Sequence, residues 1–457
     1  MYTSDIERPV IKAFIYNGEY YLYDTYTNRL FGIPKDEYTE IKMLEKIGFD
    51  AYLNNPKDTR SYKNVVMLLS KGMLRKPFVQ EISHSETQYV KQLTDRCVND
   101  LTLQVTKDCN FACRYCTFSC NSNMARNHEK TNMPWNIAKR CIDFLYSHSS
   151  DMNTVTISFY GGEPLLNYEL ITQVVEYSEK LFQSKRVDFV MTTNGSILTD
   201  KMIDFLAEHR FLLTLSFDGP PDIQNYHRKF LTNGEGTHDL VYRNIMRLKA
   251  RKPDYYNSFV SMNPVVFYDE DKEQILEYHM DRFGLPKKRI TLRDATMNGI
   301  DYIPSHIGDK SKKTDNDILE VFPEELEDTF RNIYNNKENV STIWHHNGPC
   351  VPSVRMIFAD VNGCFYPCEK CPEEDYFLIG DINNGLKMNK IIDLMNIGKM
   401  SIKKCQTCWA MRFCNICSIR CYDYDRQTIT YEKKQKACRE EQEKVLLFLE
   451  EMIKSKR

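Results

Sequence analysis

The sequence lacks a net charge of either sign, a long apolar run and an N-terminal signal segment. Its 457 residues include 61 lysines and arginines against 63 aspartates and glutamates, so there is no global basic excess of the kind that suggests nucleic acid. No apolar run is long enough to span a membrane, and Met1–Arg8 lacks the apolar core of a signal peptide. We therefore expect no nucleic acid and no membrane as partners, and a cytoplasmic location.

Cysteine is absent from the whole stretch between Cys141 and Cys350, although the chain holds 16 cysteines. Those before the gap begin at Cys97, and those after it end at Cys438. A reducing compartment argues against a disulfide framework, and structural buried thiols would scatter more evenly along the chain. The clustering therefore favours metal sites in two parts of the sequence.

Residues 1–90 are predicted to form a small separate domain. Short strands joined by tight polar turns are expected at Ile11–Tyr16, Tyr20–Tyr26 and Arg29–Ile33, followed by helices from Pro34 to Gly48 and Ser61 to Lys71 and a possible wing at Gly72–Pro77. This topology resembles the PqqD-like peptide-recognition element, a winged-helix fold that binds leader peptides. The alternative is a structural cap on the next domain.

Residues 91–340 alternate between predicted strands and helices. The strands are Leu101–Val105, Thr154–Phe159, Val187–Met191, Leu212–Phe217, Ser258–Met262 and Arg289–Leu292. The helices that separate or follow them are roughly 134–148, 168–183, 199–209, 237–250, 270–283 and 319–335. Such alternation implies an α/β fold with a parallel sheet and right-handed crossovers. Six units suit a partial (β/α)6 barrel, whose ligands bind at the carboxyl ends of the strands.

Cys109, Cys113 and Cys116 directly follow the first of these strands. Three thiolates can hold three irons of a 4Fe–4S cube and leave the fourth iron without a protein ligand. This spacing resembles the radical S-adenosylmethionine (SAM) superfamily, whose fold is the partial barrel expected here. A zinc site with Cys120 as fourth ligand is the alternative.

The later motifs agree with that resemblance because each follows a predicted strand. Phe159-Tyr-Gly161-Gly162-Glu163-Pro164 resembles the family's Gly-Gly-Glu element, whose backbone and carboxylate help to hold the SAM amine. The resemblance implies further SAM-binding roles for the aromatic residue before the last cluster cysteine, for two polar residues after the third strand, and for two residues near the fourth; these are Tyr115, Thr193, Asn194, Ser216 and Arg228. Each alone is more simply a turn former or a core residue.

The chemistry implied by the resemblance is reductive cleavage of SAM at the cluster. The resulting 5′-deoxyadenosyl radical would remove a hydrogen atom from an unactivated carbon of a substrate. The cofactor supplies that step, and the protein supplies orientation and exclusion of water. No general base is evident; Asp218 and Glu163 are catalytic candidates by position alone.

The cysteines after the gap resemble a SPASM auxiliary-cluster domain, expected at 341–457 with a C-terminal helix. They follow its spacing from Cys350 through Gly363 to Cys368, then Cys405, Cys408 and Cys414, and finally Cys438. This chain departs from the family spacing at Cys417, which lies one residue before the position where the family has a cysteine. Cys421 is the alternative candidate for that position. The resemblance implies a distal cluster on Cys405, Cys408, Cys414 and Cys438, and a nearer one on Cys350, Cys368 and Cys417. Cys364, Cys371 or Cys421 would complete the nearer cluster, or it would keep an open iron. Zinc knuckles are the alternative.

Together these features resemble maturases of ribosomally made peptides, most closely those that form thioether crosslinks in cysteine-rich precursors (the sactipeptide and ranthipeptide type). The resemblance implies three 4Fe–4S clusters (one SAM-binding, two auxiliary), a precursor peptide with a leader, and a flavodoxin or ferredoxin-type electron donor. The alternatives are carbon–carbon crosslinking, conversion of Ser or Cys to formylglycine as in sulfatase maturation, and a peptide-binding regulatory iron–sulfur protein without radical chemistry.

Overall fold

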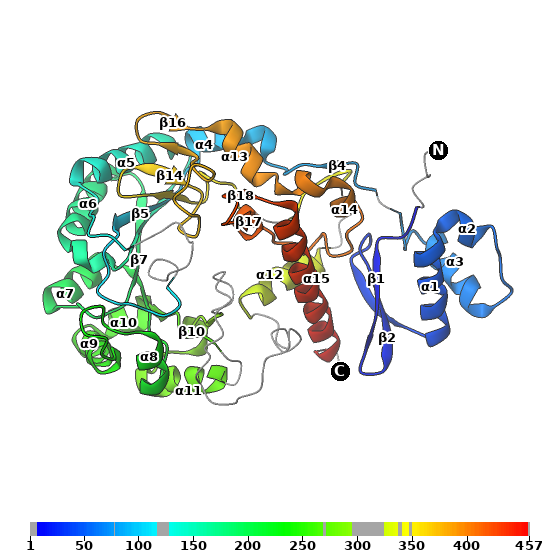
Figure 1. Cartoon of the computed structure of the whole chain (residues 1–457), viewed down its shortest axis with the longest axis horizontal. Helices are drawn as coiled ribbons and strands as arrows, with labels where there is room; N and C mark the ends of the chain where they lie inside the picture. Colours follow the sequence, from blue (N-terminus) through cyan, green and yellow to red (C-terminus); the bar gives the residue numbers. More distant parts are fainter. Residues whose placement is uncertain are drawn as a thin grey trace.

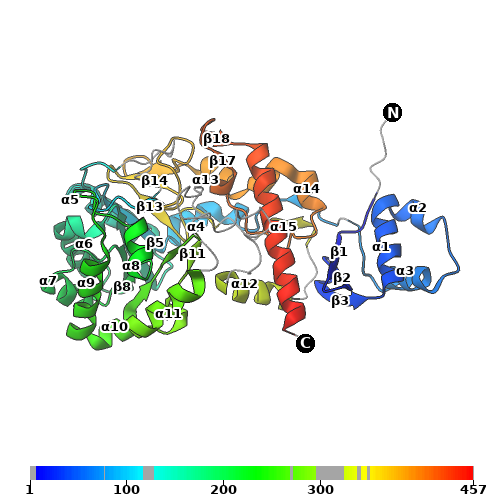
Figure 2. The same ribbon diagram turned by 60° about the horizontal axis from the view of Figure 1, so that its bottom comes forward.

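The computed structural model describes residues 7–76, 78–116, 128–267, 271–294, 324–336, 341–346 and 350–455. Figure 1 shows three parts along the long axis: an α/β unit, a cysteine-rich part that ends in the long helix α15, and a small N-terminal domain. The helix α15 (Tyr431–Lys454) stands beside the N-terminal domain in both Figure 1 and Figure 2.

The N-terminal domain has an antiparallel sheet with three helices on one face. The sheet runs in the order β1 (Ile11–Tyr16), β2 (Glu19–Asp24), β3 (Arg29–Ile33), and the helices are α1 (Lys35–Ile47), α2 (Phe49–Leu53) and α3 (Arg60–Ser70). Asn17 and Gly18 both have positive φ, 50° and 79°, as a tight two-residue hairpin turn requires. After α3 ends at Ser70, residues 72–76 of the expected wing contain no strand, and Gly72 has a positive φ of 80°. Pro77 lies outside the described residues. The winged-helix assignment stays a prediction.

A nine-stranded sheet forms the centre of the α/β unit. Five parallel strands, β5 (Asp100–Thr106), β6 (Thr154–Gly161), β7 (Arg186–Thr193), β8 (Leu212–Leu215) and β9 (Val260–Met262), lie in sequence order. The helices around and between them are α4 (Val90–Arg96), α5 (Trp135–His148), α6 (Tyr168–Leu181), α7 (Asp200–Glu208), α8 (Pro221–His227), α9 (His238–Arg251) and α10 (Pro253–Phe259). Leu101, Leu103 and Val105 of β5 are fully buried, because helices cover the faces of a parallel sheet. The expected parallel α/β sheet is therefore present.

The sixth strand, expected at Arg289–Leu292, does not form a ladder. Pro286 precedes a turn of 3₁₀ helix at Lys287–Arg289, and only Ile290 makes a single parallel bridge to Met262. A separate two-stranded ladder pairs β10 (Val265–Val266) with β11 (Arg293–Asp294), and α11 (Asp271–Phe283) lies between them in sequence. The helix expected at 319–335 is described as α12 (Glu324–Asn335).

The sheet continues past the domain boundary predicted between residues 340 and 341. The strand β13 (Ile357–Ala359) pairs in parallel with β5, and β14 (Cys364–Tyr366), β15 (Gly380–Asp381) and β16 (Gly385–Leu386) extend the sheet antiparallel from it. The remaining elements are β4 (Glu81–Ile82) paired with β12 (Ile343–Trp344), the hairpin β17 (Tyr422–Asp423) and β18 (Thr428–Ile429), and the helices α13 (Met388–Met395) and α14 (Ile402–Gln406). The first cysteine-rich strands thus join the central sheet at its β5 edge.

The N-terminal domain packs against the cysteine-rich part. Tyr23 of β2 lies with Phe413 and Phe448 in one buried cluster, and the Arg412 guanidinium donates to the carbonyl oxygens of Thr25 (2.6 Å) and Tyr26 (2.7 Å). Burial of such aromatic side chains contributes about 1.5–3 kcal/mol each. The domain is therefore integrated with the C-terminal helix rather than tethered to it.

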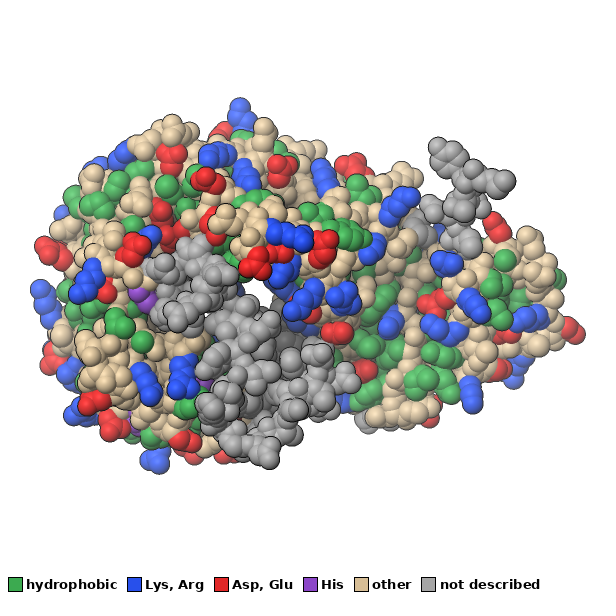
Figure 3. All heavy atoms as spheres, in the orientation of Figure 1, with side chains coloured by type: hydrophobic (Ala, Val, Ile, Leu, Met, Phe, Trp, Pro, Cys, Tyr) green, Lys and Arg blue, Asp and Glu red, His purple; other side chains and the backbone are tan. Residues whose placement is uncertain are grey.

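Two surface observations concern partners. No helix within the described ranges is both long and apolar enough to cross a membrane. On the face drawn in Figure 3, basic and acidic side chains are interspersed and no large area carries one sign.

Candidate active site

The loop that carries Cys109, Cys113 and Cys116 lies at the carboxyl end of β5 and is anchored by backbone hydrogen bonds at two positions between these cysteines. The Ala112 N–H donates to the Lys229 carbonyl (2.8 Å), and the Arg114 N–H donates to the His227 carbonyl (2.9 Å). These bonds hold the loop against the segment that follows α8. The three cysteines are therefore fixed at the sheet edge where ligands of parallel α/β folds bind.

Gly161 and Gly162 bring the end of β6 against this loop. The Gly162 N–H donates to the Thr106 carbonyl at 3.1 Å. A Cβ at Gly162 would lie 2.2 Å from the Asp108 carbonyl oxygen and 2.8 Å from the Cys109 Cβ, and a Cβ at Gly161 would lie 2.2 Å from the Thr106 carbonyl oxygen. Only glycine permits this approach of two backbones.

Glu163 ties the ends of β6 and β7 together. Its fully buried carboxylate accepts from the Thr193 hydroxyl (2.6 Å) and from the backbone N–H groups of Asn194 (2.7 Å) and Leu165 (3.1 Å). Burial raises the pKa of Glu163, although these three donors oppose the rise. The arrangement gives Glu163 a bracing role; a role as a base remains a prediction.

Asn110 extends this bracing to the cysteine loop. The Asn194 amide donates to the Asn110 Oδ1 (2.9 Å), and the Asn110 amide donates to the Ser196 hydroxyl (2.8 Å). Sequence reasoning missed Asn110 and Ser196; the adjacency of Asn110 to Cys109 was the available signal.

Tyr115, Asp218 and Arg228 form a buried group beside the loop. The Arg228 guanidinium donates to both oxygens of Asp218 (3.0 and 3.1 Å), and the Tyr115 hydroxyl donates to the same carboxylate (2.7 Å to Oδ2). Burial lowers the pKa of Arg228, but the charge of Asp218 outweighs it and holds the pKa above its usual value. Asp218 also accepts from the Val265 N–H at 3.0 Å. This saturated carboxylate orients its neighbours.

An aromatic wall that sequence reasoning missed adjoins this group. The rings of His227 and Phe267 stack with centroids 3.8 Å apart, and the Phe267 ring lies 5.5 Å from that of Tyr115. Burial lowers the pKa of His227 to about 4, so its imidazole is neutral near pH 7. The residue types alone gave no signal, because an isolated His and Phe are ordinary core residues.

The three loop thiols suit a metal cluster. Burial raises the pKa of Cys109 to about 12 and that of Cys113 further, and negative charge on Cys116 adds to both shifts. Several thiolates buried close together are unfavourable in the absence of a cation. A metal bound among them stabilises the thiolates, because thiols that coordinate a metal are deprotonated. The Phe111 N–H also donates to the Cys109 sulfur (3.4 Å), while the Cys116 sulfur lies 3.6 Å from His128 Nε2, a neighbour without a sequence signal.

The zinc alternative needs Cys120 as its fourth ligand and stays a prediction. In the part of the chain that the structure describes, no three His, Cys, Asp or Glu side chains are positioned to hold a single metal ion. Structural zinc needs four ligands on one ion, at about 2.0–2.3 Å. A cluster attaches each thiolate to a different iron and does not need that convergence. Cys120 lies outside the described residues.

The distal cysteine set gathers around α14 and α15. Burial raises the pKa of Cys408, and negative charge on Cys405 and Cys438 adds to that rise. Burial and the charge of Glu441 raise the pKa of Cys414, with smaller contributions from Cys408 and Cys438. Donors from α15 approach two of the sulfurs: Lys434 Nζ lies 3.6 Å from Cys405 Sγ, and Gln442 Nε2 lies 3.5 Å from Cys408 Sγ. Cys408 and Cys414 thus each lie within electrostatic reach of two other thiols of the predicted distal set, and a cluster on the four thiols stays a prediction.

Ser216 lies at the end of β8, where its backbone N–H donates to the Thr193 carbonyl (2.9 Å) and its side chain is half-buried.

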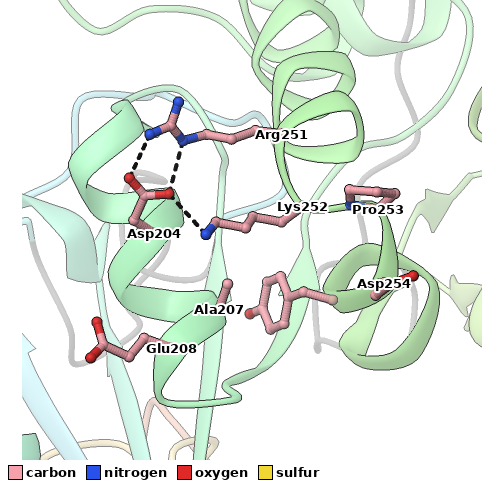
Figure 4. Close-up of a pocket in the computed structure, with 8 residues that line it drawn as sticks. Asp204, Ala207, Glu208, Arg251, Lys252, Pro253 and Asp254 are labelled. Atoms are coloured by element: carbon pink, nitrogen blue, oxygen red, sulfur yellow. Dashed lines mark hydrogen bonds and ion pairs between the residues drawn. The ribbon is translucent and has the colours of Figure 1, made fainter.

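A surface pocket between α7 and α10 lies apart from all the residues above (Figure 4). Three of its charged side chains are paired, with Arg251 Nη2 2.6 Å from Asp204 Oδ2 and Lys252 Nζ 3.2 Å from Asp204 Oδ1. It contains none of the predicted site residues.

Comparison with known proteins agrees with this geometry. Residues 103–280 match the model of the radical SAM superfamily. The chain is 28% identical over 188 residues to a serine-type anaerobic sulfatase-maturating enzyme of Bacteroides thetaiotaomicron, covering 40% of this chain and 44% of that enzyme. It is 25% identical over 196 residues to a radical SAM cyclopropyl synthase of Paramaledivibacter caminithermalis, covering 41% and 39%. These matches span less than half the length of either curated relative.

The fold is shared with a solved structure of native anSMEcpe with bound AdoMet and Cp18Cys peptide. The TM-score is 0.55 at 19% sequence identity, and the match covers 79% of this chain and 99% of that chain. The resemblance drawn from the cysteine spacing is confirmed for the central α/β unit. Residues 103–280 of this chain form a radical SAM domain.

Proposed function

We propose that this protein is a radical SAM enzyme that modifies a ribosomally made peptide, with a 4Fe–4S cluster on Cys109, Cys113 and Cys116. The observation that carries the proposal is the three-thiol loop, fixed against Gly162 at the ligand-binding edge of the sheet. When bound, the cluster and SAM supply one-electron chemistry that removes hydrogen from an unactivated carbon. A flavodoxin or ferredoxin-type protein is the proposed electron donor.

The chain's own residues would bind and orient the cofactor. Gly161, Gly162, Glu163, Thr193, Asn194, Ser216, Arg228 and Tyr115 stand at the ends of adjacent strands or beside the loop, as a SAM site requires. Buried Asp218 and Arg228 fix Tyr115, and buried Glu163 fixes the ends of two strands. Polar and charged groups that are already oriented in a site without water do not need to reorganise when charge develops during the reaction.

We further propose that the product is a thioether crosslink between a cysteine sulfur and a carbon of the precursor. Closing that bond takes one hydrogen atom from the carbon, releases the thiol proton to solvent, and leaves one electron to be accepted. The cysteines of residues 341–457 are proposed to hold two auxiliary clusters in a SPASM domain, and these clusters would supply the electron acceptor. The gathering of the distal thiols around α15 supports this role.

The test is anaerobic incubation of the reconstituted enzyme with SAM, a reductant and a cysteine-rich precursor peptide encoded beside its gene. A thioether product has lost a pair of hydrogen atoms per crosslink, and its cysteine no longer reacts with iodoacetamide. A mass loss with every cysteine still alkylated would instead favour carbon–carbon bond formation, the candidate that similarity to the cyclopropyl synthase supports. Formylglycine in place of Ser or Cys would favour the candidate that similarity to the sulfatase-maturating enzyme supports.

The N-terminal domain is proposed to bind the leader at the edge strand β3. One face of its sheet packs on α1–α3 through Leu22 and the other on the cysteine-rich part through Tyr23. Within the described residues, β3 pairs with β2 alone, so its other edge can accept a peptide as an added strand.

Hydrogen–deuterium exchange checks this proposal without disturbing the domain. Addition of a synthetic leader peptide is expected to slow exchange in residues 29–33, because new backbone hydrogen bonds protect the amides. Residues 168–181 of α6 serve as the internal reference and should not change. Protection elsewhere with unchanged exchange in β3 would refute the edge-strand mode. Deleting residues 1–90 is a poorer test, because it would uncover Phe413 and Phe448.

A further inference from the structure

One face of the helix α15 carries hydrogen-bond donors to the distal cysteine set. Lys434, Cys438 and Gln442 follow one another at intervals of four residues and therefore lie along the same side of the helix. The Lys434 Nζ lies 3.6 Å from the Cys405 sulfur, and the Gln442 Nε2 lies 3.5 Å from the Cys408 sulfur. This helix face thus supplies one predicted ligand and, a turn before and a turn after it, a donor to another predicted ligand.

Lys434 is buried although its side chain carries a charge. It is 1% exposed, and lysine is almost never fully buried unless it is paired. Within the described residues, its ammonium contacts the Ser401 hydroxyl and the Cys405 sulfur and no carboxylate. A buried charge is costly unless an opposite charge compensates it. The Cys405 sulfur is the contacted atom that can carry negative charge, and it does so when it binds a metal.

Ser401 adds a further donor at the same sulfur. Its hydroxyl oxygen accepts from the Lys434 ammonium and lies 3.4 Å from the Cys405 sulfur, so its own hydrogen is available to that sulfur. The Gly398 carbonyl oxygen, 3.8 Å away, can accept only from the protonated form of Cys405. A thiol sulfur is a weak acceptor, whereas hydrogen bonds to a charged group are stronger. Two donors at Cys405 and one at Cys408 therefore suit sulfurs that carry the negative charge of metal ligands.

We propose that Lys434 and Gln442 raise the reduction potential of the metal centre on the distal set. Hydrogen bonds to the ligand sulfurs and a nearby positive charge stabilise the reduced form, because reduction adds one negative charge to the centre. Both are positioning residues, since they act through the sulfurs of Cys405 and Cys408. The inference rests on the proposed function, in which an auxiliary cluster accepts the electron left by thioether closure, and it names residues that favour that reduction.

The test measures the midpoint potential of the distal centre in the full chain. Cys109, Cys113 and Cys116 are replaced by alanine in the parent protein, so that the later cysteines alone hold iron. The parent is reconstituted with iron and sulfide and reduced stepwise at controlled potentials, with an EPR spectrum recorded at each step. The signal that is lost when C405A is added to this parent belongs to the distal set.

Three variants of the parent separate charge from hydrogen bonding. K434M removes the charge at a similar side-chain length, K434Q removes the charge but keeps an N–H donor, and Q442M removes the amide from a half-buried position. K436M is the matched control, because it removes the same charge from an exposed position of α15. Near-native circular dichroism and unchanged iron content show that each variant has folded.

K434M is expected to move the midpoint potential of the distal signal to more negative values. K434Q and Q442M should give smaller shifts in the same direction, and K436M should give none. Equal midpoint potentials in K434M and K436M would overturn the inference and leave the auxiliary clusters standing. If K434M does not hold its iron, an unshifted signal in Q442M overturns the inference in the same way. Zinc in place of iron, or no bound metal in the parent, would overturn the proposed auxiliary clusters and the inference with them.

Discussion

Replacing Cys113 by serine is expected to reduce 5′-deoxyadenosine formation to the level of a no-enzyme control. Cys113 is the middle thiol of the loop, and its pKa is raised by burial, so in the absence of metal the site disfavours a thiolate. Loss of one of three ligands leaves a cube with too few protein contacts. The product is measured by mass spectrometry after anaerobic reduction in the presence of SAM.

The matched control for that variant is Cys97→Ser. Cys97 is half-buried at the end of α4 and belongs to neither predicted cysteine set. Its replacement should leave both iron content and 5′-deoxyadenosine formation close to those of the wild type. Equal activity of Cys113→Ser and Cys97→Ser would remove the loop from the chemistry.

Replacing Arg228 by methionine is expected to lower the free energy of unfolding by about 3–5 kcal/mol, because it strands the Asp218 charge in the interior. Asp218 is fully buried and Arg228 is 6% exposed, so water cannot substitute for the lost partner. Urea unfolding of the anaerobic protein measures the effect. The SAM affinity should fall as well, because the Asp218 carboxylate, which accepts from the Tyr115 hydroxyl, loses the guanidinium that orients it.

Two further variants separate charge from packing. Adding Asp218→Asn to Arg228→Met removes the stranded charge and should restore part of the lost stability. Arg96→Met removes an exposed ion pair with Asp151 and should have little effect, because water screens surface pairs. Arg228→Met as stable as the wild type would show that the buried pair makes no contribution.

Most of the central sheet could be predicted from the sequence because its strands are buried on both faces and alternate with amphipathic helices. Leu101–Val105 was expected as a strand and lies within β5, Asp100–Thr106. The predicted strand to Phe217 ends at Leu215, and the Ser216 N–H makes one more bond to β7, at the Thr193 carbonyl. The sixth strand, predicted at Arg289–Leu292, does not form a ladder. Its short apolar run follows a proline and a basic turn.

The additional strands at the β5 edge could not be predicted. The strand β13 has three residues and β15 has two, too few for a periodic pattern. The cysteine of β14 and the glycines of β15 and β16 are also residues typical of loops. Pairing between β13 and β5 joins residues far apart in the sequence, and local propensity carries no information about such contacts.

The individual site residues were found by spacing, but their partners were not. Asp218 was expected as a catalytic candidate by position, and the structure shows its carboxylate accepting from Tyr115, Arg228 and Val265. Such saturation depends on three segments meeting in space.

The most direct test of the account is the yield of 5′-deoxyadenosine from the reconstituted wild-type protein with SAM and dithionite under anaerobic conditions. We expect it to form with an equal amount of methionine, and to form faster when a precursor peptide is present. Absence of 5′-deoxyadenosine from protein that holds its full complement of iron and sulfide would contradict the account and favour a peptide-binding iron–sulfur protein.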